Sequence, residues 1–424
     1  MSDPQITVDP AADADRYLAT DHTVWFAEVP AASTETQLIG LAKDQRFAAD
    51  IAGESGTTDP GTYPGVYGVY PMTLPVPGPG GPHLLPCAGL TWVGVHPDHR
   101  RQGVLTAMLR DHFERVRGTE GTHLSALHAS EPAIYGRFGY GMASLEHEIT
   151  LGHGSTLRAP HLDDAARSVR TQLVTVTDAD VPERLRECHL AAAEPGSIIG
   201  DVAYYDSVCL QLPEWLRDKE PYRVLFARRD GVDVGWALFR RKPKWDNARP
   251  AGELEVWAMV GDPAARLALL RRLLDFDLMG TVKVGTVGVD DPILHWAGGP
   301  RATSDVSTYD SLWVRLVDLP AALAARWWSA PVDVVVAVAD RHAPWNDGSW
   351  RIRVDDEGLA EVTPSRDDAD LRLGVEALGA AYLGAGNLVA LRRAGLVDER
   401  RPGAAAELWR GLRTDVAPTA AVGF

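Results

Sequence analysis

Three segments of this 424-residue chain recur later in the sequence in the same order, and this repetition constrains the fold more than any other feature. The members of each pair share a strand or helix pattern and proline positions. The pairs are Gln5–Leu18 with Gln172–Leu185, Leu90–Leu109 with Leu254–Leu273, and Glu131–Tyr135 with Asp291–His295. We therefore expect the same fold to occur twice. A chance likeness of common strand and helix pieces is the alternative.

The hydrophobic pattern predicts strands and helices within the first copy. Strands are expected at 5–9, 63–74, 85–95 and 122–129, and helices at 11–25, 34–43 and 103–117. The segment Pro75–Pro82 reads PVPGPGGP, which predicts a loop that supports neither a helix nor strand pairing.

The pattern changes after Ser311. Strands are expected at 312–317, 332–338 and 350–354, and helices at 319–328, 375–383 and 404–412. Because domains usually hold about 100–200 residues, a chain of this length needs several. We expect an α+β fold with mixed sheets in three domains. They are a first copy at 1–155, a degenerate second copy at 165–308 and a third domain at 309–424.

Acidic residues outnumber basic residues by 58 to 42, and the formal net charge is −16. Such a chain is a poor general binder of nucleic acids or anionic membranes and attracts small cations. Solubility alone is the other explanation of this charge.

Cysteine usage, the N-terminus and the lack of a long apolar run predict a cytoplasmic protein. Cys87, Cys188 and Cys209 form neither a metal spacing nor an even disulfide framework, which favours a reducing compartment. The N-terminus lacks the regions of a signal peptide, and no apolar run approaches the roughly 18 residues of a membrane span.

The segment Val93–Met108 reads VGVHPDHRRQGVLTAM, an apolar strand that enters a helix through two arginines and a glycine. Unpaired N–H groups and the helix dipole attract anions to such a helix start. Gly103 lets a phosphate approach the backbone, and Arg100 and Arg101 add charge. The segment therefore predicts a diphosphate site. A surface arginine pair on an ordinary helix is the alternative.

Two other segments are interpreted as structural. The second copy has Ala264–Leu267 (AARL) in place of the arginines and the glycine, so we expect it to be a structural partner. The run His96–His99 has no partner ligands at a metal spacing, so we interpret it as a turn and expect no metal.

The pattern V-x-V-x-P-x-x-R-R-x-G in this strand and helix resembles the coenzyme A motif of GNAT acetyltransferases. Together with Leu127–Tyr140 (LHASEPAIYGRFGY), the duplication and the third domain, it makes the chain resemble the Eis (enhanced intracellular survival) N-acetyltransferase family over nearly its whole length. The resemblance implies tandem GNAT domains, a sterol-carrier-protein-like third domain and a hexamer. It also implies acetyl transfer from acetyl-CoA to primary amines of varied substrates, including aminoglycosides.

The resemblance further implies which residues contact coenzyme A. The strand backbone at Val93, Gly94 and Val95 would pair with the pantetheine arm. The diphosphate would lie at the helix start, formed by Arg100, Arg101, Gln102, Gly103, Val104, Leu105 and Thr106. Leu105 stands where the family usually has Gly or Ala, which predicts a tighter cradle. Ser130 and Glu131 match a coenzyme-contacting pair of the family.

Acetyl transfer to an amine needs a neutral amine, a hydrogen-bond donor for the thioester oxygen and a proton for the leaving thiolate. Tyr135 is our candidate for the proton donor, because it follows the strand expected at 122–129 and matches the family's general acid. Tyr140 is the rival phenol, and we interpret it as structural. An aromatic core residue is the alternative for Tyr135.

The base is less obvious from the sequence. Chemistry alone leaves His128, Glu131 and Glu28 open, and a lone histidine at a strand end is more often a packing or pocket residue. The resemblance implies that the C-terminal carboxylate, here that of Phe424, is the base. Gly423 stands where the family has an acidic residue, which predicts weaker binding of polycations.

Aromatic side chains and a carboxylate suit an ammonium ligand, so we expect the amine pocket to be lined by such residues. The candidates are Trp25, Phe26, Glu28, Trp92 and His128, and core packing is the alternative for them. The resulting prediction is an acetyl-CoA-dependent N-acetyltransferase for aminoglycosides, polyamines or lysine-like amines. The alternatives are a protein lysine or N-terminal acetyltransferase, and a non-catalytic acyl-CoA- or lipid-binding protein.

Overall fold

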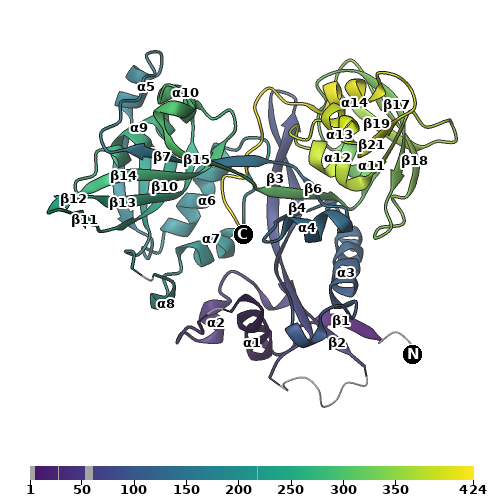
Figure 1. The fold of residues 1–424 in the computed structure, drawn as a ribbon, viewed down its shortest axis with the longest axis horizontal. Helices are drawn as coiled ribbons and strands as arrows, with labels where there is room; N and C mark the ends of the chain where they lie inside the picture. Colours follow the sequence, from purple (N-terminus) through teal and green to yellow (C-terminus); the bar gives the residue numbers. More distant parts are fainter. Residues whose placement is uncertain (1–4, 27, 53–60, 217) are drawn as a thin grey trace. The chain divides into compact units, whose positions relative to one another are not determined.

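The computed structural model describes residues 5–26, 28–52, 61–216 and 218–424, and Figure 1 shows its ribbon. The chain forms two compact units. The first unit contains the residues up to 143, residues 313–413 and Phe424, and the second contains residues 144–312 and 414–423. Within the described ranges, no helix is long and apolar enough to cross a membrane.

The first unit is built on a seven-stranded sheet with the order β1-β2-β3-β4-β5-β16-β6. Its strands are β1 (Ile6–Pro10), β2 (Arg46–Ile51), β3 (Gly65–Gly78), β4 (Gly81–Val95), β5 (Leu124–His128), β16 (Leu312–Leu316) and β6 (Gly141–Met142). Neighbours from β1 to β4 run antiparallel, whereas β5 runs parallel to β4. All four strands predicted in the first copy are therefore present.

β3 and β4 form one long antiparallel hairpin, and β3 continues to Gly78. The prediction of an unpaired loop at Pro75–Pro82 is therefore wrong. Proline has no N–H, so a strand tolerates it where no neighbouring strand needs that donor. β2 pairs with β3 only as far as Gly68, and the Pro77 carbonyl accepts a hydrogen bond from the Trp327 N–H. The proline-rich part of β3 thus lies beyond the reach of β2.

Helices cover both faces of this sheet (Figure 1). They are α1 (Ala14–Trp25), α2 (Thr34–Gln37), α3 (Val104–Gly118) and the short α4 (Pro132–Tyr135). α3 buries the apolar residues Val104, Met108 and Phe113 in a core that includes Tyr67 of β3. α1 packs on the other face, where a Cβ added to Gly68 would lie 3.2 Å from the Tyr17 hydroxyl oxygen.

The second unit repeats this architecture with the strand order β8-β9-β10-β13-β14-β7-β15. Its strands are β7 (Leu145–Gly152), β8 (Arg170–Thr175), β9 (Arg223–Arg229), β10 (Val232–Lys242), β13 (Gly252–Gly261), β14 (Met279–Gly288) and β15 (Ser304–Asp310), with a small hairpin of β11 (Trp245–Asp246) and β12 (Arg249–Pro250). Its helices are α5 (Asp163–Ser168), α6 (Val181–Ala191), α7 (Val202–Cys209), α8 (Pro213–Leu216), α9 (Pro263–Leu274) and α10 (Pro292–Trp296). When the two strand orders are compared position by position, each strand of the second sheet occupies the place of its counterpart in the first sheet.

The two sheets exchange one strand each. β7 follows β6 along the chain, yet it pairs with β14 and β15 in the second sheet. β16 follows β15, yet it pairs with β6 in the first sheet. The first unit consequently stops at residue 143 and resumes at 313, and residues 144–155, which the sequence assigned to the first domain, lie in the second unit.

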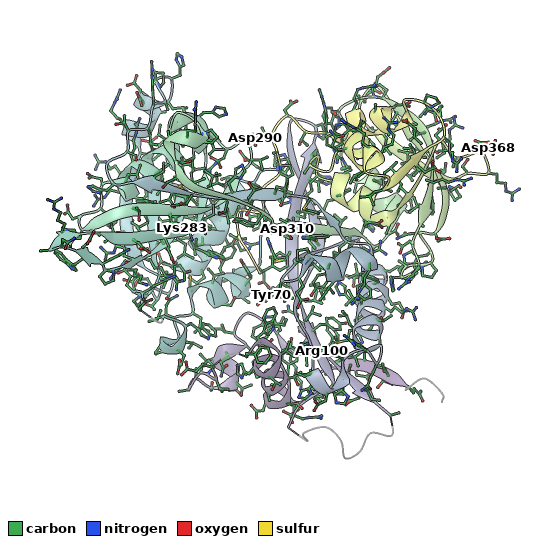
Figure 2. The ribbon with its side chains drawn as sticks, viewed as in Figure 1. Tyr70, Arg100, Lys283, Asp290, Asp310 and Asp368 are labelled. Atoms are coloured by element: carbon green, nitrogen blue, oxygen red, sulfur yellow. The ribbon has the colours of Figure 1, made fainter. Side chains whose placement is uncertain are left out.

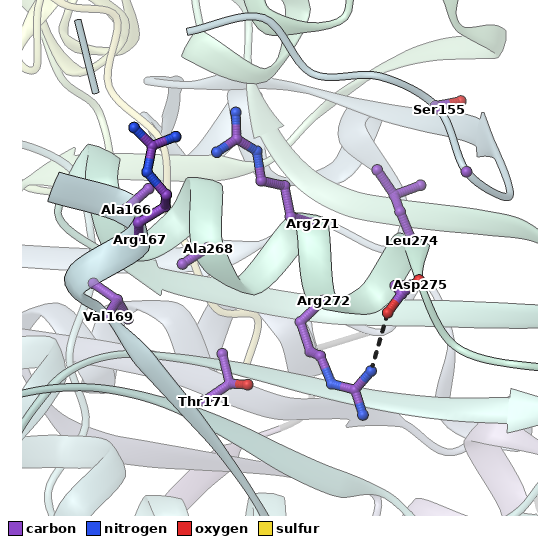
Figure 3. Close-up of a pocket in the computed structure, with 11 residues that line it drawn as sticks. Ser155, Ala166, Arg167, Val169, Thr171, Ala268, Arg271, Arg272, Leu274 and Asp275 are labelled. Atoms are coloured by element: carbon purple, nitrogen blue, oxygen red, sulfur yellow. Dashed lines mark hydrogen bonds and ion pairs between the residues drawn. The ribbon is translucent and has the colours of Figure 1, made fainter. Parts of the chain in front are cut away.

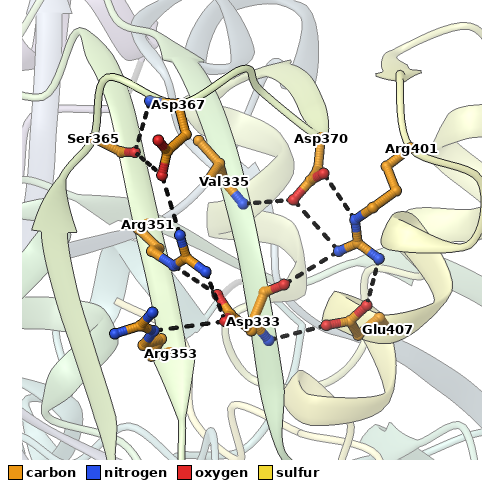
Figure 4. A network of polar contacts seen from close by, with 9 residues as sticks. All are labelled: Asp333, Val335, Arg351, Arg353, Ser365, Asp367, Asp370, Arg401 and Glu407. Carbon is orange, nitrogen blue, oxygen red and sulfur yellow. Dashed lines mark hydrogen bonds and ion pairs between the residues drawn. The ribbon is translucent and has the colours of Figure 1, made fainter.

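The third domain belongs to the first unit and has a five-stranded sheet with the order β19-β18-β17-β20-β21. Its elements are α11 (Leu319–Ala324), β17 (Val332–Ala339), β18 (Gly348–Val354), β19 (Ala360–Pro364), β20 (Leu371–Gly374), α12 (Val375–Ala381), α13 (Leu388–Arg393), β21 (Val397–Glu399) and α14 (Ala404–Leu412). Figure 4 shows a polar network on it, in which Asp333 binds Arg351 and Arg401 joins Asp370 to Glu407.

Two contacts fix this domain to the first sheet. Arg315 of β16 donates two hydrogen bonds, of 2.6 and 2.7 Å, to the carboxylate of Asp340 at the end of β17, and both side chains are fully buried. The backbones of β6 and α12 also lie close together. A Cβ added to Gly141 would lie only 2.1 Å from the Glu376 carbonyl oxygen of α12. Only glycine fits at that position of β6.

Candidate active site

β4 and β5 part at a defined point. Their pairing covers three residues of each strand and ends at Gly89 and Ala126, whereas β4 continues to Val95 and β5 to His128. A bulge at Trp92, whose φ is 53°, bends β4 at this point. On the side of β5, the backbone of Val93–Val95 therefore has a gap instead of a neighbouring strand, as an extended ligand that adds to a sheet edge requires, whereas its other side still pairs with β3.

The helix that follows has an open N-terminus. Gly103 precedes α3 with a φ of 92°, which favours glycine, and no side chain caps the helix. A Cβ at Gly103 would meet only Ile6, at 3.7 Å, so the space above the helix start is open. Arg101 also has a positive φ, of 65°, and its side chain, like that of Arg100, is exposed. Such uncapped N–H groups beside guanidinium groups fit a diphosphate.

The equivalent helix of the second unit is closed by its own sequence. Asp262 caps α9 by accepting a hydrogen bond of 2.8 Å from the Ala265 N–H, and Pro263 removes one further donor. The Arg229 guanidinium pairs with the same carboxylate at 2.9 Å. Because a carboxylate already occupies the anion position, this helix start repels a diphosphate.

Tyr135 ends α4, seven residues after the end of β5. Its side chain is 8% exposed and packs edge-on against Tyr140, with ring centroids 6.0 Å apart. Burial and, to a smaller extent, the charge of Glu131 raise the pKa of Tyr135 to about 12. The phenol therefore stays protonated at neutral pH and is able to donate a proton. Glu131 and Ser130 are exposed at the start of α4.

The rival phenol of Tyr140 is committed to a buried hydrogen-bond chain. Its hydroxyl lies 2.8 Å from the Ser125 hydroxyl, which lies 2.8 Å from the His112 Nε2. Tyr140 and Ser125 are fully buried, and burial lowers the pKa of His112 to about 3. The contacts agree with a structural role for Tyr140.

Phe424 lies at the end of the paired part of β4 and β5. Its ring is edge-on to His128 at 5.0 Å and to Tyr70 at 6.5 Å between ring centroids. A Cβ added to Gly89 would lie 3.0 Å from the Phe424 ring. The Trp92 indole N–H donates to the Tyr70 hydroxyl at 3.2 Å. The structure thus brings together three predicted site residues: Trp92 and Phe424 both contact Tyr70, and His128 contacts Phe424. Figure 2 labels Tyr70, and Arg100 at the turn before α3.

The residues that precede Phe424 are held within the second unit. Glu146 accepts hydrogen bonds from the Thr419 hydroxyl at 2.8 Å and from the Ala420 N–H at 2.7 Å. The Tyr204 hydroxyl donates to the Gly423 carbonyl at 2.7 Å. These bonds restrict the motion of the segment that leads to Phe424.

The remaining predicted pocket residues lie at the end of α1. Trp25 is 49% exposed, and Phe26, which ends the helix with a φ of 51°, is 85% exposed. Glu28 is exposed as well. Sequence reasoning missed Asp21, a buried carboxylate on the same helix that hydrogen-bonds the Trp25 indole. A charged residue one helical turn after Tyr17, on the packed face of α1, was the available signal.

His96–His99 forms a short 3₁₀ turn in which the His96 Nδ1 accepts a hydrogen bond from the Asp98 N–H at 3.4 Å. The turn predicted there is confirmed. Within the described ranges, no three His, Cys, Asp or Glu side chains gather as metal ligands would.

Figure 3 shows a groove of the second unit between α5 and α9 that is open to solvent. Its three arginines are paired with neighbouring carboxylates: Arg167 with Asp164, Arg271 with Asp163 at 2.6 Å and Arg272 with Asp275 at 3.5 Å. None of the three therefore offers an anion an unpaired charge.

Family models match successive parts of the chain. Two different models, each described as an acetyltransferase (GNAT) domain, match residues 13–143 and 196–319, and a sterol carrier protein domain model matches residues 319–420. The fold class predicted from the sequence, tandem GNAT domains with a sterol-carrier-like third domain, is thereby confirmed.

Individual proteins are similar over most of their length. An uncharacterized N-acetyltransferase of Streptomyces avermitilis is 39% identical over 85% of this chain and 86% of its own. N-acetyltransferase Eis of Mycobacterium tuberculosis is 32% identical over 74% of each chain. The crystal structure of Eis1 from Mycobacterium abscessus matches with a TM-score of 0.79 and 28% identity, over 99% of this chain and 100% of that one. The chain therefore belongs to the Eis-like N-acetyltransferases of the GNAT superfamily.

Proposed function

We propose that this N-acetyltransferase transfers the acetyl group of acetyl-CoA to a primary amine of a small cationic molecule, with Tyr135 as general acid and the Phe424 carboxylate as general base. Polyamines and aminoglycosides are the substrate classes we favour. The observation that carries the proposal is the position of Phe424, whose ring lies against His128 where β4 and β5 part.

The gap and the open helix start support binding of the co-substrate. Val93–Val95 offers free backbone groups to the pantetheine arm, and Gly103 with Arg100 and Arg101 forms the diphosphate cradle. Gln102, Val104, Leu105 and Thr106 complete the helix start. Acetyl-CoA supplies the acetyl group as an activated thioester.

The terminal carboxylate and the Tyr135 hydroxyl then each transfer one proton. The terminal carboxylate accepts the proton that the amine loses as its nitrogen bonds to the acetyl carbon. When the carbon–sulfur bond breaks, the Tyr135 hydroxyl donates its proton to the sulfur. The raised pKa of Tyr135, about 12, keeps this proton in place until the thiolate forms.

The net charge of −16 and the aromatic residues Trp25, Phe26 and Trp92 favour a cationic acceptor, and Glu28 adds a carboxylate. Gly423 adds no charge beside the terminal residue. A protein lysine is the second acceptor class, since its side chain presents the same primary amine.

A lipid-carrier role is less well supported. The interior of the third domain contains Arg326, which is 2% exposed and donates to the carbonyl groups of Trp327 at 3.1 Å, Leu412 at 2.7 Å and Tyr382. A guanidinium among α11, α12 and α14 makes this interior polar, whereas an acyl chain requires an apolar cavity. The enzyme hypothesis is therefore preferred.

The test mixes the full-length protein with acetyl-CoA and one amine at a time, and follows free thiol together with the mass of the amine. We expect thiol release that matches a gain of one acetyl group on a polyamine or an aminoglycoside. Thiol release with a peptide lysine alone would favour the protein substrate, and no release with any amine would favour the binding protein. The hexamer and the cytoplasmic location stay predictions, and light scattering of the purified protein tests the first.

A further inference from the structure

Asp21 is a buried acidic side chain in the first unit that lacks a cationic partner. It lies on α1 and is 9% exposed. Its hydrogen-bond partner is the Trp25 indole. Within the described part of the chain, no lysine, arginine or histidine forms an ion pair with it. Burying a carboxylate without a countercharge is costly, so such a group either takes up a proton or binds a cation.

A buried hydroxyl without a hydrogen-bond partner lies one helical turn earlier on the same helix. The Tyr17 hydroxyl is fully buried and has no hydrogen-bond partner, and burial and, to a smaller extent, the charge of Asp21 raise its pKa well above the usual value. A buried hydroxyl without a partner, one helical turn from a buried carboxylate without a countercharge, indicates that a ligand supplies the missing interactions.

Tyr17 lies beside the wall of the candidate active site. The Tyr17 ring lies 6.1 Å from the Trp92 ring, and the Trp92 indole donates to the Tyr70 hydroxyl. Tyr70 in turn packs edge-on against Phe424. A series of aromatic contacts thus leads from Tyr17, the neighbour of Asp21 on α1, to the terminal residue, and aromatic faces attract ammonium groups.

We propose that Asp21 and Tyr17 bind a second ammonium group of the acceptor, so that the enzyme prefers diamines and polyamines to monoamines. The inference rests on the proposed function, which places acetyl transfer beside Phe424. One amine of the substrate reacts there, and the other is held by the Asp21 carboxylate. The same contact sets the spacing between the two amines that the enzyme accepts.

The protonation of Asp21 gives this contact a pH dependence. Burial raises the pKa of Asp21 to about 7, and the Trp25 hydrogen bond opposes part of this rise. The titratable or charged groups around the pair are Tyr17 on α1, Tyr67 and Tyr70 on β3, and Arg46 on β2. Below pH 7 the carboxyl is neutral, so the KM for a diamine rises as the pH falls through about 7.

Stability depends on pH in the opposite sense. Because the folded-state pKa lies above the usual value of 3.8, the neutral form is the one that the fold favours. The stabilisation is fully present below about pH 4 and is lost as the pH rises through about 7. A bound diamine should therefore raise the thermal midpoint more at pH 8 than at pH 6, by pairing with the ionised carboxylate.

The experiment compares diaminobutane with butylamine as acceptors for the full-length protein and its Asp21→Asn variant. We expect the substitution to raise the KM for diaminobutane by about 10-fold or more, with little change in kcat, and to leave the KM for butylamine unchanged. It should also remove the inflection near pH 7 from kcat/KM for diaminobutane. Tyr17→Phe should raise the same KM by a smaller factor.

Asp15→Asn is the matched control, because it removes one exposed negative charge from the same helix. Equal effects of Asp15→Asn and Asp21→Asn, or equal effects of Asp21→Asn on both amines, would overturn the inference. Calorimetric binding of diaminobutane to the Tyr135→Phe variant, with and without Asp21→Asn, separates the two proposals. Diamine binding that depends on Asp21 supports this inference even when no turnover is seen, and binding that ignores Asp21 refutes it.

Discussion

The phenyl ring of Phe424 lies edge-on to the imidazole of His128, with 5.0 Å between ring centroids. His128 is the last residue of β5, and β5 has already separated from β4 at this point. The last residue of the sequence therefore stands beside the gap into which the proposed pantetheine arm fits. Five expected outcomes follow from this arrangement and from the fold around it.

Replacing Tyr135 with Phe removes the proposed proton donor while keeping the ring that packs on Tyr140. We expect kcat to fall by about 100-fold or more, with little change in the KM for acetyl-CoA, because general acid catalysis acts in the transition state. Thiol release measures both constants, and thermal unfolding checks the fold. A kcat within a few-fold of the wild type would remove Tyr135 from the mechanism.

Two residues added after Phe424 move the terminal carboxylate away from its position. We expect kcat to fall by about 100-fold, because such displacement of a catalytic group is costly. Phe424→Leu is the control, since it keeps the carboxylate and removes only the ring contacts with His128 and Tyr70. It should reduce kcat less than the extension does. The base assignment fails if the extended protein is fully active.

The substitution Gly103→Ala tests the proposed diphosphate site at the start of α3. Gly103→Ala places a Cβ at a residue with a φ of 92° at the helix start, and we expect the KM for acetyl-CoA to rise by about 10-fold. Gly121→Ala is the matched control, because Gly121 has a φ of 75° and open space for a Cβ. Both variants should lose about 1–2 kcal/mol of unfolding free energy, but only the first should change the KM. Equal KM values would argue against the cradle.

Calorimetric titration with coenzyme A should give one site per chain. At the start of α9, the equivalent helix of the second unit, the Asp262 carboxylate and its partner Arg229 occupy the place where an anion would bind. Gly103→Ala should consequently weaken all of the observed binding. Two sites per chain, or binding that survives in the Gly103 variant with unchanged affinity, would contradict this assignment.

The buried pair of Arg315 and Asp340 should contribute strongly to stability. Asp340→Asn leaves the guanidinium buried without its countercharge, and we expect a loss of about 3–5 kcal/mol in the free energy of unfolding by denaturant. Asp398→Asn breaks the half-exposed pair with Arg400 and should cost less than about 1 kcal/mol. Similar losses in the two variants would show that burial does not govern this pair.

The local signals of the sequence were sufficient for much of the fold. Gly103 between a strand and a helix predicted the turn that the structure contains, because a positive φ and an uncapped helix start are both local properties. The repeats predicted a second sheet of the same order for a similar reason, since each repeated piece is one strand and helix pattern.

Features that depend on distant neighbours were not predictable in this way. The strand character of Pro75–Pro82 depends on where β2 stops pairing, which no property of that segment reveals. The exchange of β7 and β16 depends on a choice between two nearly equivalent sheet positions. Asp21 became a candidate only when its burial and its missing cation were known.

The exchanged strand β16 has a consequence for synthesis on the ribosome. When β6 has left the exit tunnel, its partner in the first sheet has not yet been translated, because the whole second repeat comes first. Until β16 is made, the first repeat therefore has an open sheet edge, and such an edge favours aggregation and chaperone binding. A truncated gene that encodes the first repeat alone would make a protein with this edge permanently exposed.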